Sequence, residues 1–246
     1  MREILSDLVA EEQSLDQFLQ QINPRDWRKT TVWHGWTIHE TVSHLASSEE
    51  YAYNALAEKG SRLKELDEFG DIDALNAAGL SAGLDMRPQD VIEWWRGARA
   101  KVVEELSRSS ATDRVPWFFG SMSAKSFATA RLMETWAHGI DIYYAVGEEP
   151  EETTRIRHIA WLAWKSLPHV FKEAGEEYPS EVRAEFRGPL YSKWVFGPED
   201  ASNVIRGEAT EWAALAVDRI DLEDTQTLTA KGDLAQRALE LVRVHL

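Results

Sequence analysis

The sequence predicts a mainly α-helical protein with a small α+β unit at its C-terminal end. Three observations support this fold class. Up to about residue 174, apolar side chains recur at helical spacing over long stretches. Glycine, proline and acidic residues then cluster between Glu173 and Ser180, as in a linker. Beyond that point the apolar residues alternate, which is typical of strands. The expected domains are therefore residues 1–178 and 179–246.

Two helices are expected at the N-terminal end. The first covers residues 2–22, where apolar side chains form one stripe, and Pro24 closes it. The second has a well-marked start, because Thr37 and Glu40 stand in the T-x-x-E spacing of a capping box. This helix should continue to about Glu58.

A third helix is expected from about Pro88 to about residue 107, because proline suits the first position of a helix. The polar stretch 61–87 before it gives no definite prediction. The segment 112–126 after it reads as a loop that contains Trp117, Phe118 and Phe119. A loop with this many aromatic residues either covers part of the hydrophobic core or lines a pocket.

The remaining segments divide between the two domains. Residues 127–147 form the next helix, which Gly147 ends, and a further helix is expected over about residues 150–174. In the C-terminal domain we expect strands at 182–186, 191–196, 203–207 and 227–230, and helices over 208–217 and from 233 onward.

Composition narrows the possible functions. With 246 residues, 43% hydrophobic residues and 11 Trp, the chain has ample material for a core. Its formal net charge of -15 argues against a nucleic-acid partner, because no basic stripe is present to neutralise phosphates. The acidic N-terminal helix does not resemble a signal peptide, and no apolar run approaches the ~20 residues of a membrane span. We therefore expect a cytoplasmic protein without a membrane partner.

The chain has no cysteine. It can form no disulfide, and it has neither a thiolate metal ligand nor a cysteine nucleophile. Any thiol chemistry must therefore use a small-molecule thiol.

The helix over residues 127–147 carries a row of charged or titratable side chains. Arg131, Glu134, His138 and Asp141 are spaced three, four and three residues apart, so they share one narrow face. A carboxylate and an imidazole one turn apart are a suitable pair of metal ligands. An ordinary amphipathic helix with a solvated polar side has the same pattern, so both interpretations stay open for this helix alone.

His44 lies at the margin of the apolar face of the second helix, in a row with small residues. Such a histidine is more often a hydrogen-bonded structural residue than a ligand. His39 points about 140° away from His44, since five residues turn a helix through about 500°. His34, in the preceding loop, is close enough in sequence to approach the site of His44. Three other histidines lack partners at the spacing of metal ligands. These are His158, His169 and His245.

Three segments resemble one family. WTIHETVSHLA resembles the segment that opens the second helix of DinB-like four-helix bundles, in the branch that contains the mycothiol-dependent maleylpyruvate isomerases. METWAHGIDIYYAVG resembles the matching metal-binding segment of that branch. The C-terminal unit, with GEATEWAALAVDR and TLTAKGD, resembles the small sterol-carrier-like domain that follows the bundle. PWFFGSMSAKSFATARLMETWAHGIDI resembles most closely an actinobacterial subfamily described as metal-binding.

The resemblance implies a four-helix bundle whose metal ligands are His44, Glu134 and His138. Two imidazoles and a carboxylate are typical of a catalytic zinc site, which keeps a position open for water or substrate. Nickel, iron or manganese would also accept these ligands. Asp141 is either an acceptor that orients His138 or an exposed acid.

Further candidate site residues come from helical position, from the resemblance and from the aromatic loop. Arg131 either anchors an anionic substrate group or pairs with the carboxylate. Arg219 would match an arginine that reaches from the C-terminal domain toward the metal, or else it is a surface residue. Trp117 and Phe118 are expected to bind the cofactor at the rim of a site at the domain junction.

The resulting functional expectation is a metal-dependent enzyme that uses a low-molecular-weight thiol. The thiol is mycothiol if the resemblance holds, and the reaction is transfer to, or isomerisation of, a small electrophile. One alternative is a non-catalytic metal-binding or small-molecule-binding protein. Another is hydrolysis by metal-activated water. The expected partners are the thiol and a small-molecule substrate, and the chain is expected to be a monomer or a homodimer.

Overall fold

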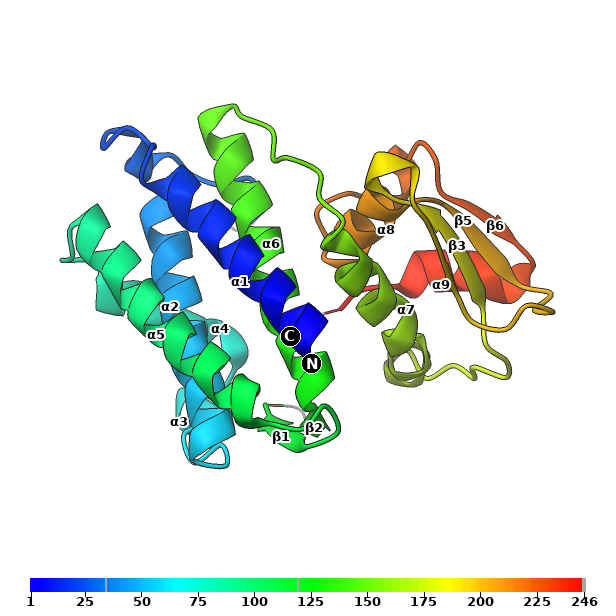
Figure 1. Ribbon diagram of the computed structural model, residues 1–246, viewed down its shortest axis with the longest axis horizontal. Helices are drawn as coiled ribbons and strands as arrows, with labels where there is room; N and C mark the ends of the chain where they lie inside the picture. The colour runs from blue at the N-terminus through cyan, green and yellow to red at the C-terminus, as the bar shows by residue number, and fades with distance from the viewer. Residues whose placement is uncertain (34, 119, 245–246) are drawn as a thin grey trace. The chain divides into compact units, whose positions relative to one another are not determined.

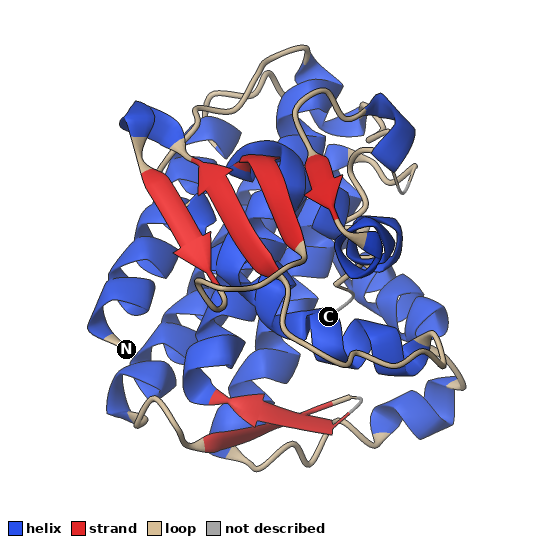
Figure 2. Cartoon of the chain, turned by 90° about the vertical axis from the view of Figure 1, so that its right-hand side faces the viewer, coloured by secondary structure: helices blue, strands red, loops and turns tan. Residues whose placement is uncertain are grey.

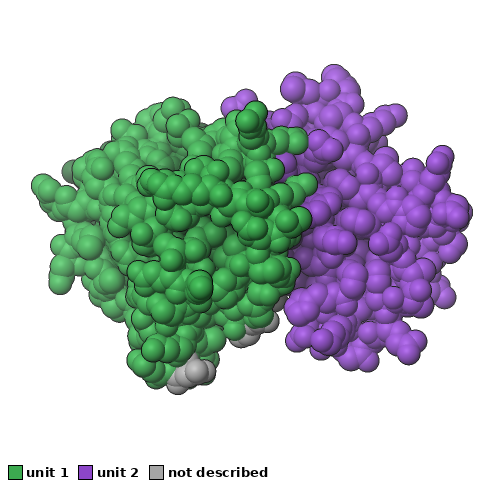
Figure 3. Space-filling view, turned by 60° about the horizontal axis from the view of Figure 1, so that its bottom comes forward, with its two compact units in different colours: residues 1–150 green, residues 151–246 purple. Residues whose placement is uncertain are grey.

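The computed structural model describes residues 1–33, 35–118 and 120–244, and for Asp67 only the backbone. Three residues that entered the sequence-based expectations, His34, Phe119 and His245, lie outside the described residues. The chain divides into two compact units, Met1–Pro150 and Glu151–Leu246, which Figure 3 shows in separate colours. Within the described residues, no helix combines the length and the apolar character of a membrane span.

The first unit is a four-helix bundle, as the sequence predicted (Figure 1). Its helices are α1 (Arg2–Leu19), α2 (Ile38–Ala57), α5 (Pro88–Arg108) and α6 (Ala124–Val146). α2 packs closely on α5 and α1 on α6, while looser α1–α5 and α2–α6 contacts close the bundle. The main core cluster combines residues of these helices with Trp27 of a short 3-10 helix, η1 (Asp26–Arg28).

Local signals set the ends of these helices. The capping box at the start of α2 is present, because Glu40 N donates to Thr37 Oγ1 at 3.2 Å and Thr37 N donates to Glu40 Oε2 at 2.7 Å. Ser123 caps α6 by accepting from Ser126 N at 3.1 Å. Gly147 ends α6 in the left-handed conformation, with φ of 82°, which glycine adopts without strain.

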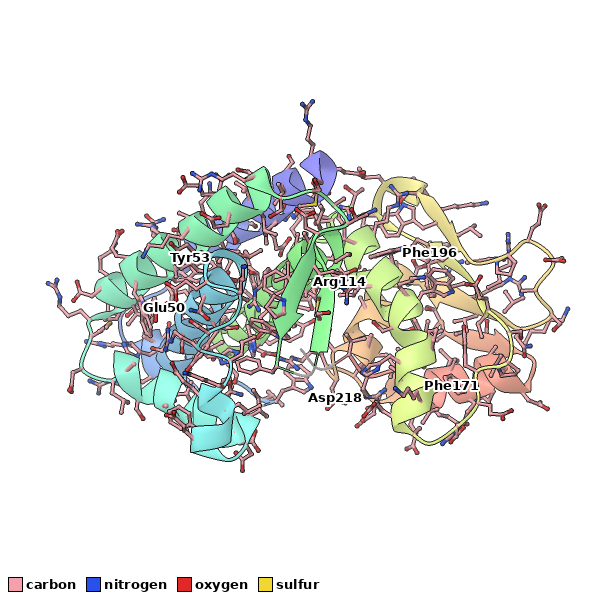
Figure 4. All side chains as sticks on the ribbon, turned by 90° about the horizontal axis from the view of Figure 1, so that it is seen from below. Glu50, Tyr53, Arg114, Phe171, Phe196 and Asp218 are labelled. Atoms are coloured by element: carbon pink, nitrogen blue, oxygen red, sulfur yellow. The ribbon has the colours of Figure 1, made fainter. Side chains whose placement is uncertain are left out.

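Two segments contain more regular structure than the sequence indicated. The stretch 61–87 forms α3 (Glu65–Phe69) and α4 (Ile72–Gly83). α4 packs on α2 at so short a distance that a Cβ at Gly83 would collide with Ser43. The expected loop 112–126 contains a hairpin of β1 (Arg114–Trp117) and β2 (Gly120–Ser123), across which Arg114 donates to the Ser121 carbonyl (Figure 4).

The second unit is a small α+β fold, as predicted, and Figure 2 shows its sheet. The strand order is β4-β3-β5-β6, with β3 and β5 parallel and the outer pairs antiparallel. The strands are β3 (Arg183–Arg187), β4 (Lys193–Phe196), β5 (Val204–Glu208) and β6 (Thr229–Lys231). The helices are α7 (Ile156–Glu173), α8 (Ala209–Ala216) and α9 (Asp233–Leu241), with short 3-10 turns η2 (Pro189–Tyr191) and η3 (Leu222–Asp224).

The position of α7 differs from the domain division read from the sequence. The expected boundary after residue 178 placed this helix with the bundle, whereas its contacts group it with the second unit. Trp212 of α8 donates its indole N–H to Ala160 O of α7 at 3.1 Å, and Trp164 donates to Val182 O at 2.7 Å. Phe171 of α7 is also buried (Figure 4). The Gly- and Pro-containing segment 173–180 is therefore a connection within the second unit.

Candidate metal centre

The bundle brings His44, Glu134 and His138 together from two helices. His44 lies in the second turn of α2, and Glu134 and His138 lie one turn apart in the middle of α6. The His44 Nε2 atom is 2.9 Å from Glu134 Oε1, and His138 Nε2 is 3.5 Å from the same oxygen. One ligand atom from each residue lies within 4.8 Å of the other two. This arrangement fits a single cation bound by two nitrogens and an oxygen.

The site is largely shielded from solvent. His44 and His138 are buried, with 8% and 5% of their surface exposed, and Glu134 is partly buried. The two imidazole rings meet edge to face with their centroids 4.8 Å apart. The half-buried indole of Trp36 lies against both rings, with centroids 5.0 Å from His44 and 6.0 Å from His138. Trp36 therefore covers part of the site.

Asp141 supports His138 from the side remote from Glu134. Its Oδ2 atom is 3.2 Å from His138 Nδ1, and the residue is 1% exposed. Of the two roles considered for Asp141, the exposed acid does not fit this position. A carboxylate on the far nitrogen of an imidazole fixes the ring orientation and leaves Nε2 to face the site.

The charges of the three residues depend on one another. Burial acts to raise the pKa of Glu134, but the hydrogen bonds of His138 and His44 and the nearby positive charge hold it well below its ordinary value. Burial lowers the pKa of His44. Burial also acts to lower the pKa of His138, yet its contacts with Asp141 and Glu134 outweigh this and raise it to about 9. Near pH 7 an ionised carboxylate thus lies between a neutral imidazole and a protonated one.

Comparison with known proteins identifies the family of this chain. The family model of the mycothiol maleylpyruvate isomerase N-terminal domain matches residues 8–143, which include all three residues of the cluster. The chain belongs to this family. Two uncharacterized proteins of Mycobacterium tuberculosis are each 33% identical to it over 245 residues, 97% of this chain and 93% of theirs.

Solved structures share the fold over almost the whole chain. Two crystal structures of a mycothiol-dependent maleylpyruvate isomerase, one of them of a mutant, superpose with TM-scores of 0.61 and 0.59. Each match covers 93% of this chain and 92% of the other, at 14% and 16% sequence identity. At such identity the likeness establishes a common fold.

Arg131, which the sequence placed on the same face as the family's ligand pair, is buried inside the bundle and hydrogen-bonded to α2. Its Nε atom donates to Glu49 Oε1 at 3.0 Å and its Nη2 atom donates to Ser48 Oγ at 2.9 Å. The residue is 1% exposed. Its partner is therefore the carboxylate of Glu49 on α2, which sequence reasoning did not identify.

The remaining site predictions concern Trp117, Phe118 and Arg219. Trp117 is buried, with its ring 5.2 Å from Phe127, and Phe118 packs 5.6 Å from Tyr51. Trp117 is a core residue and Phe118 is partly buried, and the role of both in cofactor binding remains a prediction. Arg219 belongs to the second unit, where it donates to Val217 O at 2.8 Å. Its reach to the metal centre, and the location of that centre at a domain junction, also remain predictions.

Two neighbours of the site were missed by sequence reasoning. Trp36 stands directly before the capping residue Thr37, a position that indicates proximity to the start of α2 but not contact with His44. Glu49 is 0% exposed, although an acid between Ser48 and Glu50 reads as part of a solvated face. Only its partner on α6 distinguishes it from Glu50.

Proposed function

We propose that this protein is a metal-dependent enzyme that uses a low-molecular-weight thiol, mycothiol, in S-transfer to, or isomerisation of, a small electrophile. The observation that carries the proposal is the convergence of His44, Glu134 and His138 from two helices. Membership of a family named for a mycothiol-dependent isomerase supports the choice of thiol. The chain has no cysteine, so the sulfur nucleophile must come from a separate molecule.

The donor set fits a divalent metal. Two imidazole nitrogens and one carboxylate oxygen suit zinc, and three protein ligands are typical of catalytic rather than structural zinc sites. Asp141 beside His138 Nδ1 matches the carboxylate–histidine arrangement that orients metal-binding histidines. His44, Glu134 and His138 would hold the ion. Other divalent metals accept the same ligands, so we propose zinc as the first choice and not as the only one.

The protein's own residues orient the metal-binding histidines and exclude water from the site. A divalent metal held here would lower the pKa of a coordinating thiol and so supply thiolate at neutral pH. Asp141 holds His138 with its Nε2 directed to the centre of the site. Trp36 covers both imidazoles and restricts the access of water. Burial of the histidines strengthens the electrostatic interactions within the site.

Thiol binding in the presence and absence of metal tests this proposal. We expect mycothiol to bind the zinc-loaded protein, and binding to disappear after chelation or in Glu134→Gln. Cobalt substitution adds a direct readout, because a thiol sulfur on Co2+ produces a charge-transfer band. Equal mycothiol binding by zinc-loaded and chelated protein would contradict the proposal. Turnover of an ester or amide without thiol would instead indicate a metal-dependent hydrolase.

A further inference from the structure

A second buried polar contact joins α2 to α6 beside the candidate metal centre. It consists of the Arg131 guanidinium, which donates to Glu49 at 3.0 Å and to Ser48 at 2.9 Å. Arg131 is 1% exposed and Glu49 is 0% exposed. On its other side the guanidinium carbon lies 5.7 Å from the centre of the Trp117 ring. The side chain is therefore held by hydrogen bonds and by packing.

This contact lies on the same pair of helices as the metal centre. Glu49 follows His44 by five residues on α2, and Arg131 precedes Glu134 by three residues on α6. The three-residue step from Arg131 to Glu134 is about one turn of α6. On α2, Ser48, the other acceptor of Arg131, follows His44 by four residues, which is also about one turn. The two polar contacts thus stand next to each other along one seam between the helices. α2 and α6 pack more loosely than α2 and α5, which makes these two contacts important for their mutual alignment.

The centre depends on that alignment because its ligands come from both helices. Glu134 and His138 keep their spacing by belonging to one helix, whereas His44 is placed by α2. A small slide or rotation of α6 against α2 would separate His44 from Glu134. The Arg131 guanidinium resists both movements, since its rigid fork binds two successive residues of α2.

Stability alone is a weak reason for burying such a pair. A buried ion pair contributes little net stability compared with apolar residues of similar volume, although removal of one partner is strongly destabilising. In some proteins a buried polar pair instead specifies one arrangement of packed helices. The directional contact between α2 and α6 is suited to that role.

We propose that Arg131, held by Glu49 and Ser48, is a positioning residue that sets the register of α6 against α2 and thereby the geometry of His44, Glu134 and His138. The inference rests on the proposed metal centre. It assigns no contact with substrate to Arg131. Its consequence is that the pair controls metal affinity without ligating the metal.

Two variants separate positioning from stability. Arg131→Lys keeps the positive charge but removes the planar guanidinium that donates to both Glu49 and Ser48. We expect zinc affinity to fall about 10-fold to 100-fold, as it does when groups that orient metal ligands are removed. The double variant Arg131→Met with Glu49→Leu removes both buried charges together, so neither is left unpaired. We expect it to unfold near the wild-type temperature but to show the same loss of zinc affinity and an altered Co2+ spectrum.

Two control variants test whether the effect belongs to this seam. Arg99→Lys changes another buried arginine, which pairs with Asp16 between α5 and α1. Glu50→Gln changes the exposed neighbour of Glu49, which accepts from Trp94 at 2.9 Å on the outer side of α2 (Figure 4). Both are expected to bind zinc as the wild type does, whatever their stability. Wild-type zinc affinity in Arg131→Lys and in the double variant would overturn the positioning role.

A metal-free measurement keeps this inference distinct from the proposed function. The ring 15N signals of His44 and His138 report their contacts with Glu134. We expect these signals to change in Arg131→Lys and in the double variant, and to stay unchanged in Arg99→Lys. A wild type that binds no zinc would refute the metal centre, whereas unchanged ring signals in both seam variants would refute the positioning role.

Discussion

The buried Asp16 cluster and the imidazole cluster both cross the helical bundle, and they differ in what they can bind. In the first, Asp16 of α1 accepts from Arg96 Nε at 2.7 Å and from Arg99, and Gln20 donates to it at 2.7 Å. In the second, Glu134 lies between the imidazoles of His44 and His138. A guanidinium keeps its protons at any ordinary pH and has no lone pair to offer, whereas an imidazole can lose its proton and become a ligand.

Burial alone therefore does not identify a binding site. Asp16 is 5% exposed and His138 is also 5% exposed. The Asp16 cluster pairs a carboxylate with two guanidiniums that keep their protons, whereas the imidazoles of the other cluster can release a proton and bind a cation. The following predictions use this difference, starting with the largest expected effect.

Asp16→Asn is expected to lower the free energy of unfolding by about 3–5 kcal/mol, because the buried Arg99 loses the carboxylate it donates to and the partly buried Arg96 keeps only its pair with Glu93. Zinc affinity is expected to remain that of the wild type. Chemical denaturation and zinc titration measure the two quantities. Asp90→Asn is the matched control, since Asp90 pairs with Arg87 at an exposed position and should change stability little. Loss of zinc binding in Asp16→Asn would mean that the two clusters are coupled.

The Asp16 cluster also predicts a pH dependence of stability. Burial acts to raise the pKa of Asp16, but hydrogen bonds from Arg96 and the charges of Arg99 and Arg96 lower it below its ordinary value. A lowered pKa in the folded state stabilises the protein above the unfolded pKa, about 3.9, and this contribution is lost as pH falls through the folded pKa. The stability difference between wild type and Asp16→Asn should therefore be constant near neutral pH and shrink below about pH 4. A difference that stays unchanged in acid would contradict the assigned charge state.

Glu134→Gln is expected to reduce zinc affinity by more than about 100-fold, which corresponds to about 2.8 kcal/mol, because it removes the carboxylate from the proposed ligand set. The bundle should stay folded. Elemental analysis and thermal unfolding with and without zinc provide the measurement, with Glu50→Gln as the control on the exposed side of α2. Equal zinc content and an equal zinc-dependent rise in melting temperature would show that Glu134 is not a ligand.

Asp141→Asn should reduce zinc affinity about 10-fold to 100-fold, because Asp141 orients His138 without belonging to the ligand set. Zinc titration compares this variant directly with Glu134→Gln, and the smaller loss is expected for Asp141→Asn. An effect equal to that of Glu134→Gln would place Asp141 among the ligands.

The smallest effect is expected at the start of α2. Thr37→Ala removes the capping hydroxyl and should lower the free energy of unfolding by about 1 kcal/mol, with both polar clusters intact. Denaturation and zinc titration test this expectation. A marked fall in zinc affinity would show that the position of His44 depends on the cap as well as on the packing of the helix.

Local sequence signals determined much of the bundle and of the second unit. The capping box at Thr37, the proline at the start of α5 and the glycine after α6 act on nearby backbone groups, so their effects do not depend on the rest of the fold. The same is true of the single face shared by Glu134 and His138, which the helical repeat imposes. The stretch 61–87 lacks a clear apolar repeat, and α4 forms there against α2 through contacts between small residues.

Helical periodicity does not show which distant residues meet. The family resemblance implied the meeting of His44 with Glu134, and only the tertiary structure showed that of Arg131 with Glu49. Glu134 approaches His44 across 90 residues of sequence, and Arg131 meets Glu49 across 82. No periodic pattern in either helix encodes these pairs, because each pattern describes one helix and not its register against another. For the same reason the sequence assigned α7 to the bundle, whereas the hydrogen bond between Trp212 and Ala160 ties it to the second unit. Residue type and helical spacing thus specify candidate ligands, and the packing of helices specifies which of them form one centre.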